Sequence, residues 1–379
     1  MMRNGVRISV FLPPSGGNYA GIERATTNLI LGLAGQRALI ELHLVLAEHY
    51  EQMPSQWSGV RLWVLGASRL RGCVLPLARY LREYRPDVFI VPQVATVAIV
   101  IAACRLARVK TRIISVVHGN VNFEESSSLS DRALFWLAKH FYRRSITRVI
   151  AVSEGVARGF KDIIGDQGAE VTTIYNPIIT PAWTEDARAT VRHARFTEGA
   201  APLVLAVGRL SHQKGFDTLI RAFARVRKVI PVRLMIMGEG QERPRLEALV
   251  SALKLKNDVE LPGYVAKPGP YMGQAAVFVF PSRWEGFGNV IVEAMSFGVP
   301  VIATACSYGP EEILNGGQYG RLVAVDDEQG LANAILTTLS LPPSDEMRKK
   351  LRARAHYFSQ ERAVSQYLDV IQEVMQFPP

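Results

Sequence analysis

The sequence predicts an α/β fold of two domains, each a parallel sheet covered by helices, that face a central cleft. The chain has 379 residues, and this length favours two domains because one domain usually holds about 100 to 200 residues. Short apolar runs rich in β-branched residues alternate with helical patterns almost throughout, which is typical of parallel sheets. The alternation pauses once and then restarts. Two such halves bring the carboxyl ends of two sheets to one cleft, where these sheets bind ligands.

In the first half, strands and helices are expected to alternate up to about residue 174. The strands are expected at 6–12, 87–91, 112–117, 149–153 and 170–174, and the helices near 22–34, 75–84, 95–106, 129–144 and 154–161. Residues 88–104 carry no charge, but Pro92 and Gln93 divide them and they fall short of the about 20 apolar residues that a membrane span needs. They are interpreted as a buried strand followed by a buried helix.

A stretch without periodicity follows Asn176 and Pro177 and is interpreted as the linker. Beyond it, strands are expected at 203–208, 233–238, 277–281 and 300–304, and helices near 215–228, near 241–253 and from Asn289. Residues 359–375 form an amphipathic pattern with Ser359 as its N-cap. The predicted division is a first domain over 1–180, a second over 181–358, and a C-terminal helix over 359–379 that packs back on the first domain.

The composition is that of a folded protein of a reducing compartment. Apolar residues make up 48% of the chain and charged ones 21%, so disorder is not expected. Cys73, Cys104 and Cys306 are an odd number without metal-ligand spacing and are interpreted as reduced, buried thiols. The apolar run Ile8–Leu12 is too short for a secretory signal, and a cytoplasmic location is expected.

The formal net charge of +10 is concentrated in the first half. Residues 1–180 carry 21 Lys and Arg against 13 Asp and Glu, and the rest of the chain carries 23 against 21. In Arg69–Arg85 and Leu134–Arg144 the cations interleave with aliphatic and aromatic residues, a mixture that suits an anionic membrane surface. Two amphipathic helices packed on a sheet explain the same pattern, and both interpretations can hold together. A peripheral position on the cytoplasmic face of the membrane is the corresponding expectation.

The stretch "AVGRLSHQKGFDTLIRAF" has two cations on the loop between an expected strand and an expected helix. Gly208 permits a close turn, and Arg209 and Lys214 lie on the loop before a helix that begins near Gly215. Such a junction favours a phosphate because helix-start amides add to the positive charge. The alternative is that both are solvated loop residues.

Two acids flank a glycine-rich turn in "SRWEGFGNVIVEAMSFGVPVIAT". Gly286 and Gly288 allow the backbone to approach a ligand, and Asn289 is expected to be the N-cap of the next helix. Glu285 and Glu293 would repel a diphosphate, so they are better explained as acceptors from sugar hydroxyls: a transferred hexose for Glu285 and a ribose for Glu293. A solvated helix face is the alternative, but the neighbours of Glu293 are apolar.

Together with "GEGQER" and "LPGYV", these motifs resemble the retaining glycosyltransferases of family 4, whose GT-B fold has two Rossmann-like domains. The resemblance is specific and covers about residues 203–325. It implies that Glu285 is catalytic near the donor sugar, that Glu293 binds the nucleotide ribose, and that Arg209 and Lys214 hold the diphosphate. The other donor-binding residues it implies are Gly263, Tyr264 and Val265 at the base, and Phe287, Gly288 and Asn289 at the sugar and phosphate.

In the first half the resemblance is weaker. It implies that His118, at the end of the strand in "SVVHGN", is catalytic, whereas a histidine at a strand end is by itself more often structural. "PSGGNYAGIER" resembles the glycine loop that approaches the donor phosphate, with Gly17 and Gly21 as candidates. Because Ala20, Gly21 and Ile22 stand where the family often has adjacent glycines, which glycines contact phosphate stays open.

The expected activity is transfer of a hexose from a UDP-sugar to an acceptor hydroxyl with retention. The acceptor is expected to be a glycan or lipid-linked intermediate of polysaccharide or O-antigen assembly. No cofactor and no metal are expected, since there is no Asp-x-Asp motif. A UDP-sugar epimerase and a NAD-dependent oxidoreductase stay open as alternatives, although neither half has the full G-x-G-x-x-G pattern with its acid. No nucleic-acid partner is expected, because no binding module for one is evident.

Overall fold

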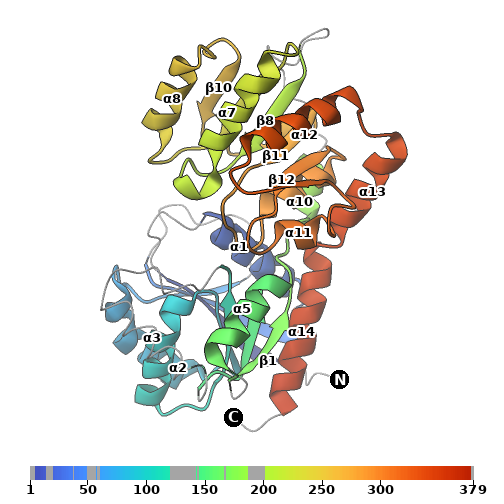
Figure 1. Cartoon of the computed structure of the whole chain (residues 1–379). Coiled ribbons are helices and arrows are strands. Elements are labelled where there is room, and N and C mark those ends of the chain that lie inside the picture. Colours follow the sequence, from blue (N-terminus) through green and yellow to red (C-terminus); the bar gives the residue numbers. More distant parts are fainter. Residues whose placement is uncertain are drawn as a thin grey trace. The chain divides into compact units, whose positions relative to one another are not determined.

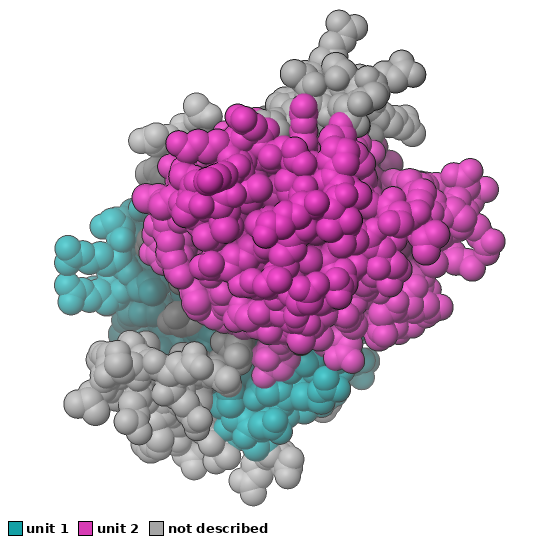
Figure 2. Space-filling view, turned by 45° about the horizontal axis from the view of Figure 1, so that its top comes forward, with its two compact units in different colours: residues 1–177, 360–379 teal, residues 178–359 magenta. Residues whose placement is uncertain are grey.

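The computed structural model describes residues 5–13, 20–36, 38–48, 57, 60–119, 142, 145–165, 168–186 and 201–376 (Figure 1). The chain forms two compact units (Figure 2). Unit 1 comprises residues 1–177 with 360–379, and unit 2 comprises residues 178–359. Each unit contains one parallel sheet with helices packed on it, which confirms the predicted fold class.

The sheet of unit 1 has the order β3-β2-β1-β4-β5-β6-β7, and all of its strand pairs are parallel. Its strands are β1 (Val6–Leu12), β2 (Ile40–Leu46), β3 (Arg61–Val64), β4 (Val88–Val91), β5 (Arg112–Val117), β6 (Arg148–Ala151) and β7 (Glu170–Thr173). Its longer helices are α1 (Ala20–Ala34), α2 (Val74–Tyr84), α3 (Val97–Ala107), α5 (Glu154–Ile164) and α14 (Gln360–Gln376). The strand order reverses between β1 and β4, and the carboxyl ends of strands at such a point form a binding crevice.

The last helix belongs to unit 1, although unit 2 precedes it in the chain. Helix α14 packs along α1 (Figure 1), so closely that a Cβ on Gly32 would lie 2.4 Å from Val364 Cγ2. Gln360 Nε2 donates to the carbonyl oxygen of Asn28 at 2.5 Å. Unit 1 is therefore built from both ends of the chain.

The sheet of unit 2 has the order β10-β9-β8-β11-β12-β13 and is also parallel. Its strands are β8 (Leu203–Val207), β9 (Arg233–Met237), β10 (Val259–Gly263), β11 (Val277–Phe280), β12 (Val301–Thr304) and β13 (Arg321–Val323). Its helices are α6 (Pro181–Asp186), α7 (Phe216–Arg227), α8 (Arg243–Ala252), α9 (Gly269–Met272), α10 (Asn289–Ser296), α11 (Pro310–Ile313), α12 (Glu328–Ser340) and α13 (Asp345–His356).

Helical periodicity explains how α7 covers this sheet. Phe216, Leu219, Ile220, Phe223 and Val226 follow one another at three- and four-residue spacing and are all buried. Burying each such side chain contributes about 1.5–3 kcal/mol. The core beneath α7 fixes the carboxyl end of β8, where the loop with the predicted cations begins.

The structure also differs from the expected elements. Strands β2, β3, β10 and β13 were not expected, and the helix expected at 129–144, with the basic stretch Leu134–Arg144, lies outside the described residues except for Tyr142. Within the part of the chain that the structure describes, no helix is both long and apolar enough to pass through a bilayer.

Candidate functional site

Glycines join four loops at the carboxyl edge of the sheet in unit 2. A Cβ on Gly215 would lie 2.1 Å from the carbonyl oxygen of Pro281, and one on Gly238 would lie 1.9 Å from that of Gly208. Gly309 approaches the carbonyl of Phe287 in the same way. All three glycines have φ between 62° and 145°, a range that disfavours other residues. The loops after β8, β9, β11 and β12 therefore pack backbone to backbone and form one site.

Lys214 and Glu285 meet in this site. Lys214 Nζ lies 2.5 Å from Glu285 Oε1, and Glu285 is only 8% exposed. The ammonium also lies over the ring of Phe280, 5.3 Å from its centroid. From the sequence, Lys214 was expected at the diphosphate and Glu285 at the donor sugar. The structure joins them in a partly buried ion pair, which holds the cation at the start of α7.

Arg283 fixes the loop that carries Glu285. Its Nη2 lies 3.0 Å from Asp217 Oδ1 and 2.8 Å from Asp326 Oδ1, and its Nη1 donates to the carbonyl oxygen of His212 at 2.6 Å. Thr218 Oγ1 donates to Asp326 Oδ1 at 2.7 Å. One guanidinium therefore connects the β11–α10 loop, the start of α7 and the turn before α12.

Asp326 is held ionised within this network. Partial burial acts to raise the pKa of Asp326, but hydrogen bonds from Arg283 and Thr218 outweigh it and place the pKa below its usual value. Asp327 is the N-cap of α12, because its Oδ1 accepts from Gly330 N at 2.8 Å. Arg283 was not expected from the sequence, where its position next to "WEGFG" is the one signal that could have indicated it.

The start of α10 corrects one expectation. Gly288, and not Asn289, is the N-cap, with φ 106° and ψ 51°, and the helix begins at Asn289. A left-handed cap needs glycine, and this is the physical reason for the difference. The helix places Glu293 in its interior, where it is 2% exposed. The alternative of a solvated helix face is therefore wrong for both acids.

The remaining predicted donor residues also lie at this edge. Gly263 ends β10 in a left-handed conformation with φ 91°, and its carbonyl accepts from Gly238 N at 2.8 Å. Tyr264 follows with an exposed side chain, and Val265 is half-buried. Arg209 is exposed on the β8–α7 loop, and the ring of Phe287 is buried.

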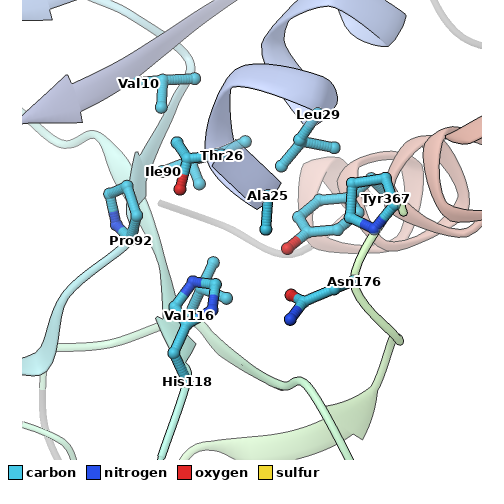
Figure 3. Close-up of a pocket in the computed structure, with 11 residues that line it drawn as sticks. Val10, Ala25, Thr26, Leu29, Ile90, Pro92, Val116, His118, Asn176 and Tyr367 are labelled. Carbon is cyan, nitrogen blue, oxygen red and sulfur yellow. The ribbon is translucent and has the colours of Figure 1, made fainter. Parts of the chain in front are cut away.

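In unit 1, His118 directly follows β5 and lines a small hollow with room for about one water molecule. Figure 3 shows its ring directed toward the space bounded by Thr26 of α1, Asn176 and Tyr367 of α14. His118 Nδ1 is buried and forms no hydrogen bond within the described residues. Burial lowers the pKa of His118 to about 4, so the imidazole is neutral at pH 7.

Of the two glycine candidates in unit 1, Gly21 lies in the first turn of α1 and is exposed. Gly17 lies outside the described residues. All three cysteines are free and buried. Among the described residues, no three His, Cys, Asp or Glu side chains are grouped closely enough to hold a metal ion.

Two parallel-sheet α/β units define the class of the GT-B glycosyltransferase fold, and in one of them glycine-lined loops surround a half-buried lysine and two buried acids. A family profile described as Glycosyltransferase Family 4 matches residues 19–180, and one described as Glycosyl transferases group 1 matches residues 201–340. The chain belongs to this glycosyltransferase family.

Among curated proteins, the chain is 34% identical over 180 residues to the lipopolysaccharide core biosynthesis glycosyltransferase LpsE of Rhizobium meliloti (strain 1021), covering 46% of this chain and 51% of LpsE. It is 35% identical over 152 residues to a Campylobacter jejuni enzyme, N-acetylgalactosamine-N,N'-diacetylbacillosaminyl-diphospho-undecaprenol 4-alpha-N-acetylgalactosaminyltransferase, covering 40% of each protein. The chain spans about half or less of the length of these relatives.

Among solved structures, Anabaena HepE in complex with UDP superposes with a TM-score of 0.78, covering 96% of this chain and 99% of HepE at 21% sequence identity. At that identity the likeness shows the fold alone.

Proposed function

We propose that the protein is a retaining hexosyltransferase that moves a sugar from a UDP-sugar to an acceptor hydroxyl of a lipid-linked glycan or polysaccharide intermediate. The observation that carries the proposal is the partly buried Lys214–Glu285 pair, on the loops that precede α7 and α10, together with the buried Glu293 of α10. Cations for a diphosphate and acids for sugar hydroxyls then occupy one edge of one sheet.

The departing diphosphate is stabilised by Arg209 and Lys214 in this mechanism. Both cations lie on the loop at the carboxyl end of β8, where negative charge develops as the bond between the anomeric carbon and phosphate oxygen breaks. Donor binding exchanges the Lys214–Glu285 contact for Lys214–phosphate and Glu285–hexose contacts. Glu293 accepts from the ribose hydroxyls. Because these two cations supply the charge, we propose that turnover needs no metal ion and no cofactor.

The similar proteins support the proposal of a UDP-sugar donor and a lipid-linked acceptor. HepE has been crystallised with UDP and with UDP-glucose, and the Campylobacter jejuni relative is named for a diphospho-undecaprenol acceptor. The neutral imidazole of His118, at the carboxyl end of β5 in unit 1, is proposed as the second catalytic residue. It can donate one hydrogen bond to a sugar hydroxyl and accept another.

Activity of two variants tests the assignment. In Lys214→Ala or Glu285→Gln we expect turnover to fall by about 10²- to 10³-fold, as for loss of one charge-stabilising group, with an unchanged circular dichroism spectrum. Lys256→Ala, an exposed cation of unit 2, is the matched control and should keep normal turnover. Near-normal rates in both site variants would show that the site is misplaced.

Further measurements on the unaltered protein test the metal independence, the stereochemistry and the donor, and distinguish the transferase from the two alternative enzymes. We expect turnover to survive EDTA, and NMR to show that the product keeps the anomeric configuration of the donor. UDP-sugars should raise the melting temperature more than other nucleotide sugars. Sugar interconversion without any acceptor would identify an epimerase instead, and dependence on NAD would identify an oxidoreductase.

We also propose that unit 1 contacts the anionic cytoplasmic face of the membrane through the outer face of α2 and α3. Leu77, Ala78 and Leu81 of α2 are buried, so the helix does pack an apolar side onto the unit. Its opposite side exposes Arg71 just before the helix, Arg79, and Leu75, which is 72% exposed. Cations around an exposed aliphatic side chain suit a lipid surface.

Helix α3 extends this surface. It lies beside α2 (Figure 1), and Arg82 Nη2 donates to the carbonyl oxygen of Leu106 at 2.8 Å. Leu106, Arg108 and Lys110 are exposed. The three free thiols fit the reducing compartment on that side of the membrane.

Flotation with vesicles tests this surface. The double variant Arg71→Glu with Arg79→Glu should lose binding to phosphatidylglycerol vesicles, by about 30-fold for the two missing cations alone. Lys254→Glu with Lys256→Glu makes the same charge change on exposed residues of unit 2 and should keep binding. Equal flotation of both variants, or no flotation of the original protein at low salt, would refute the membrane proposal.

A further inference from the structure

We infer that Arg243 is a positioning residue for nucleotide recognition: it clamps the loop Gly263–Val265 to the loop after β9 and so sets both affinity for the donor and discrimination among bases. The inference rests on the proposed donor site in unit 2. Arg243 is the first residue of α8 and has no role in the proposed transfer chemistry.

All three nitrogens of the Arg243 guanidinium donate hydrogen bonds. It forms a bidentate pair with Glu239, with Nε–Oε2 at 2.8 Å and Nη2–Oε1 at 2.7 Å. Its Nη1 donates to Glu247 Oε1 at 2.9 Å and to the carbonyl oxygen of Leu261 at 3.3 Å. Its Nη2 also reaches the carbonyl oxygen of Gly238 at 3.4 Å. One side chain thus bridges the end of β9, helix α8 and strand β10.

This clamp lies directly against the loop that is proposed to read the base. A Cβ on Gly263 would be 2.9 Å from Glu239 Oε1 and 3.8 Å from Arg243 Nη2. Gly238, whose carbonyl Arg243 contacts, donates its own N–H to the carbonyl of Gly263 at 2.8 Å. The peptide groups of Gly263–Val265 therefore take their direction from the Arg243–Glu239 pair.

The same pair also touches the loop of the diphosphate cations. The carbonyl oxygen of Glu239 accepts from Leu210 N at 2.8 Å, and the carbonyl oxygen of Leu210 accepts from Glu242 N at 3.0 Å. Leu210 directly follows Arg209. The clamp thereby fixes the distance between Gly263–Val265, the loop proposed to bind the base, and Arg209, a cation proposed to bind the diphosphate. A bound nucleotide must span that distance.

Loops held in advance in the bound geometry lose less conformational entropy when the ligand binds. Exposed ion pairs often contribute little, but the side chain of Arg243 is only 24% exposed and its partners include two main-chain carbonyls. Lysine keeps the charge but has no planar fork, so it cannot hold Glu239 and both carbonyls at once.

Steady-state kinetics on the full chain test the inference. For Arg243→Lys we expect KM for the UDP-sugar to rise about 10-fold while kcat changes by less than about 2-fold, which is the signature of lost ground-state binding. The preference for the UDP-sugar over the ADP-sugar of the same hexose should fall by a similar factor. Glu239→Gln should have the same effect, and the double variant should add little to it because both residues form one unit.

Arg245→Ala is the matched control. Arg245 lies on the same helix, its side chain is 59% exposed, and it pairs with Glu242 at 3.0 Å. Its KM and base preference should stay those of the original protein. If Arg243→Lys, with an unchanged melting temperature, also keeps the original KM and base preference, the inference is overturned.

A failure of the donor proposal gives a different result. If the unaltered protein prefers another nucleoside diphosphate, the UDP assignment is wrong. The loss of base preference in Arg243→Lys is then measured against that other base and still decides the inference.

Discussion

At the scale of single residues, burial decides which protonation state His118 can use. Its imidazole is enclosed near β5, and burial lowers the pKa from the usual 6.5 of a histidine to about 4. In the unfolded chain, His118 therefore becomes protonated below about pH 6.5, whereas in the folded protein it becomes protonated only below about pH 4. The folded state loses stability as the pH falls through that window, and above it this group has no effect.

Urea unfolding at two pH values measures this effect. Between pH 7 and pH 5, His118 alone should lower the free energy of unfolding by about 2 kcal/mol. His118→Gln should remove that share, whereas His356→Gln, an exposed residue of α13, should leave the loss unchanged. Burial lowers the pKa of His43 to about 4 as well, so part of the loss will persist in His118→Gln. An identical loss in His118→Gln and the original protein would contradict the assignment.

At the scale of elements, alternation predicted the central strands and missed β2 and the edge strands β3, β10 and β13. The central strands β1 and β5 were predicted over their observed bounds because their runs are long and apolar. Strand β2 carries Glu41 and His43 within its apolar run. At the sheet edges, β3 is partly exposed, β10 contains a proline and β13 has three residues, and edge strands need no continuous apolar run.

The candidate site was predictable where a single loop carries the signal. Glu293 was expected to be buried because its neighbours in the sequence are apolar, and the structure buries it. Arg283 and Arg243 were not predicted, because each acts through partners that only the tertiary fold brings near. Asp217 lies 66 positions from Arg283, and the carbonyl of Leu261 lies 18 positions from Arg243. Sequence spacing carries no information on such contacts.

At the scale of the whole molecule, the two chain segments that connect the units are hydrogen-bonded to each other. Ile178 N and Ile179 N both donate to the carbonyl oxygen of Phe358, at 3.0 Å and 3.2 Å. The ring of Phe358 packs edge-on against Phe287 with centroids 5.4 Å apart. The connecting segments are thereby packed on a predicted donor-binding residue, and beyond Ser359 the chain returns to unit 1 as α14.

This return makes the stability of unit 1 depend on the C-terminus of the chain. Helix α14 buries six side chains in unit 1: Ala363, Val364, Tyr367, Val370, Ile371 and Val374. Its Glu373 also pairs with the buried guanidinium of Arg148 at 3.1 Å. A chain that ends at Ser359 should therefore unfold in unit 1 at a lower temperature, while unit 2 keeps its own melting transition and its stabilisation by UDP.

A point substitution gives the graded form of this prediction. Ile371→Ala empties a fully buried position and should lower the free energy of unfolding of unit 1 by about 2–5 kcal/mol. Asp369→Ala, on the exposed side of the same helix, should stay within about 0.5 kcal/mol. Calorimetry with and without UDP separates the two units, because only the transition of unit 2 should shift with nucleotide. If Ile371→Ala and Asp369→Ala unfold alike, α14 does not stabilise unit 1, and the two ends of the chain do not form one cooperative unit.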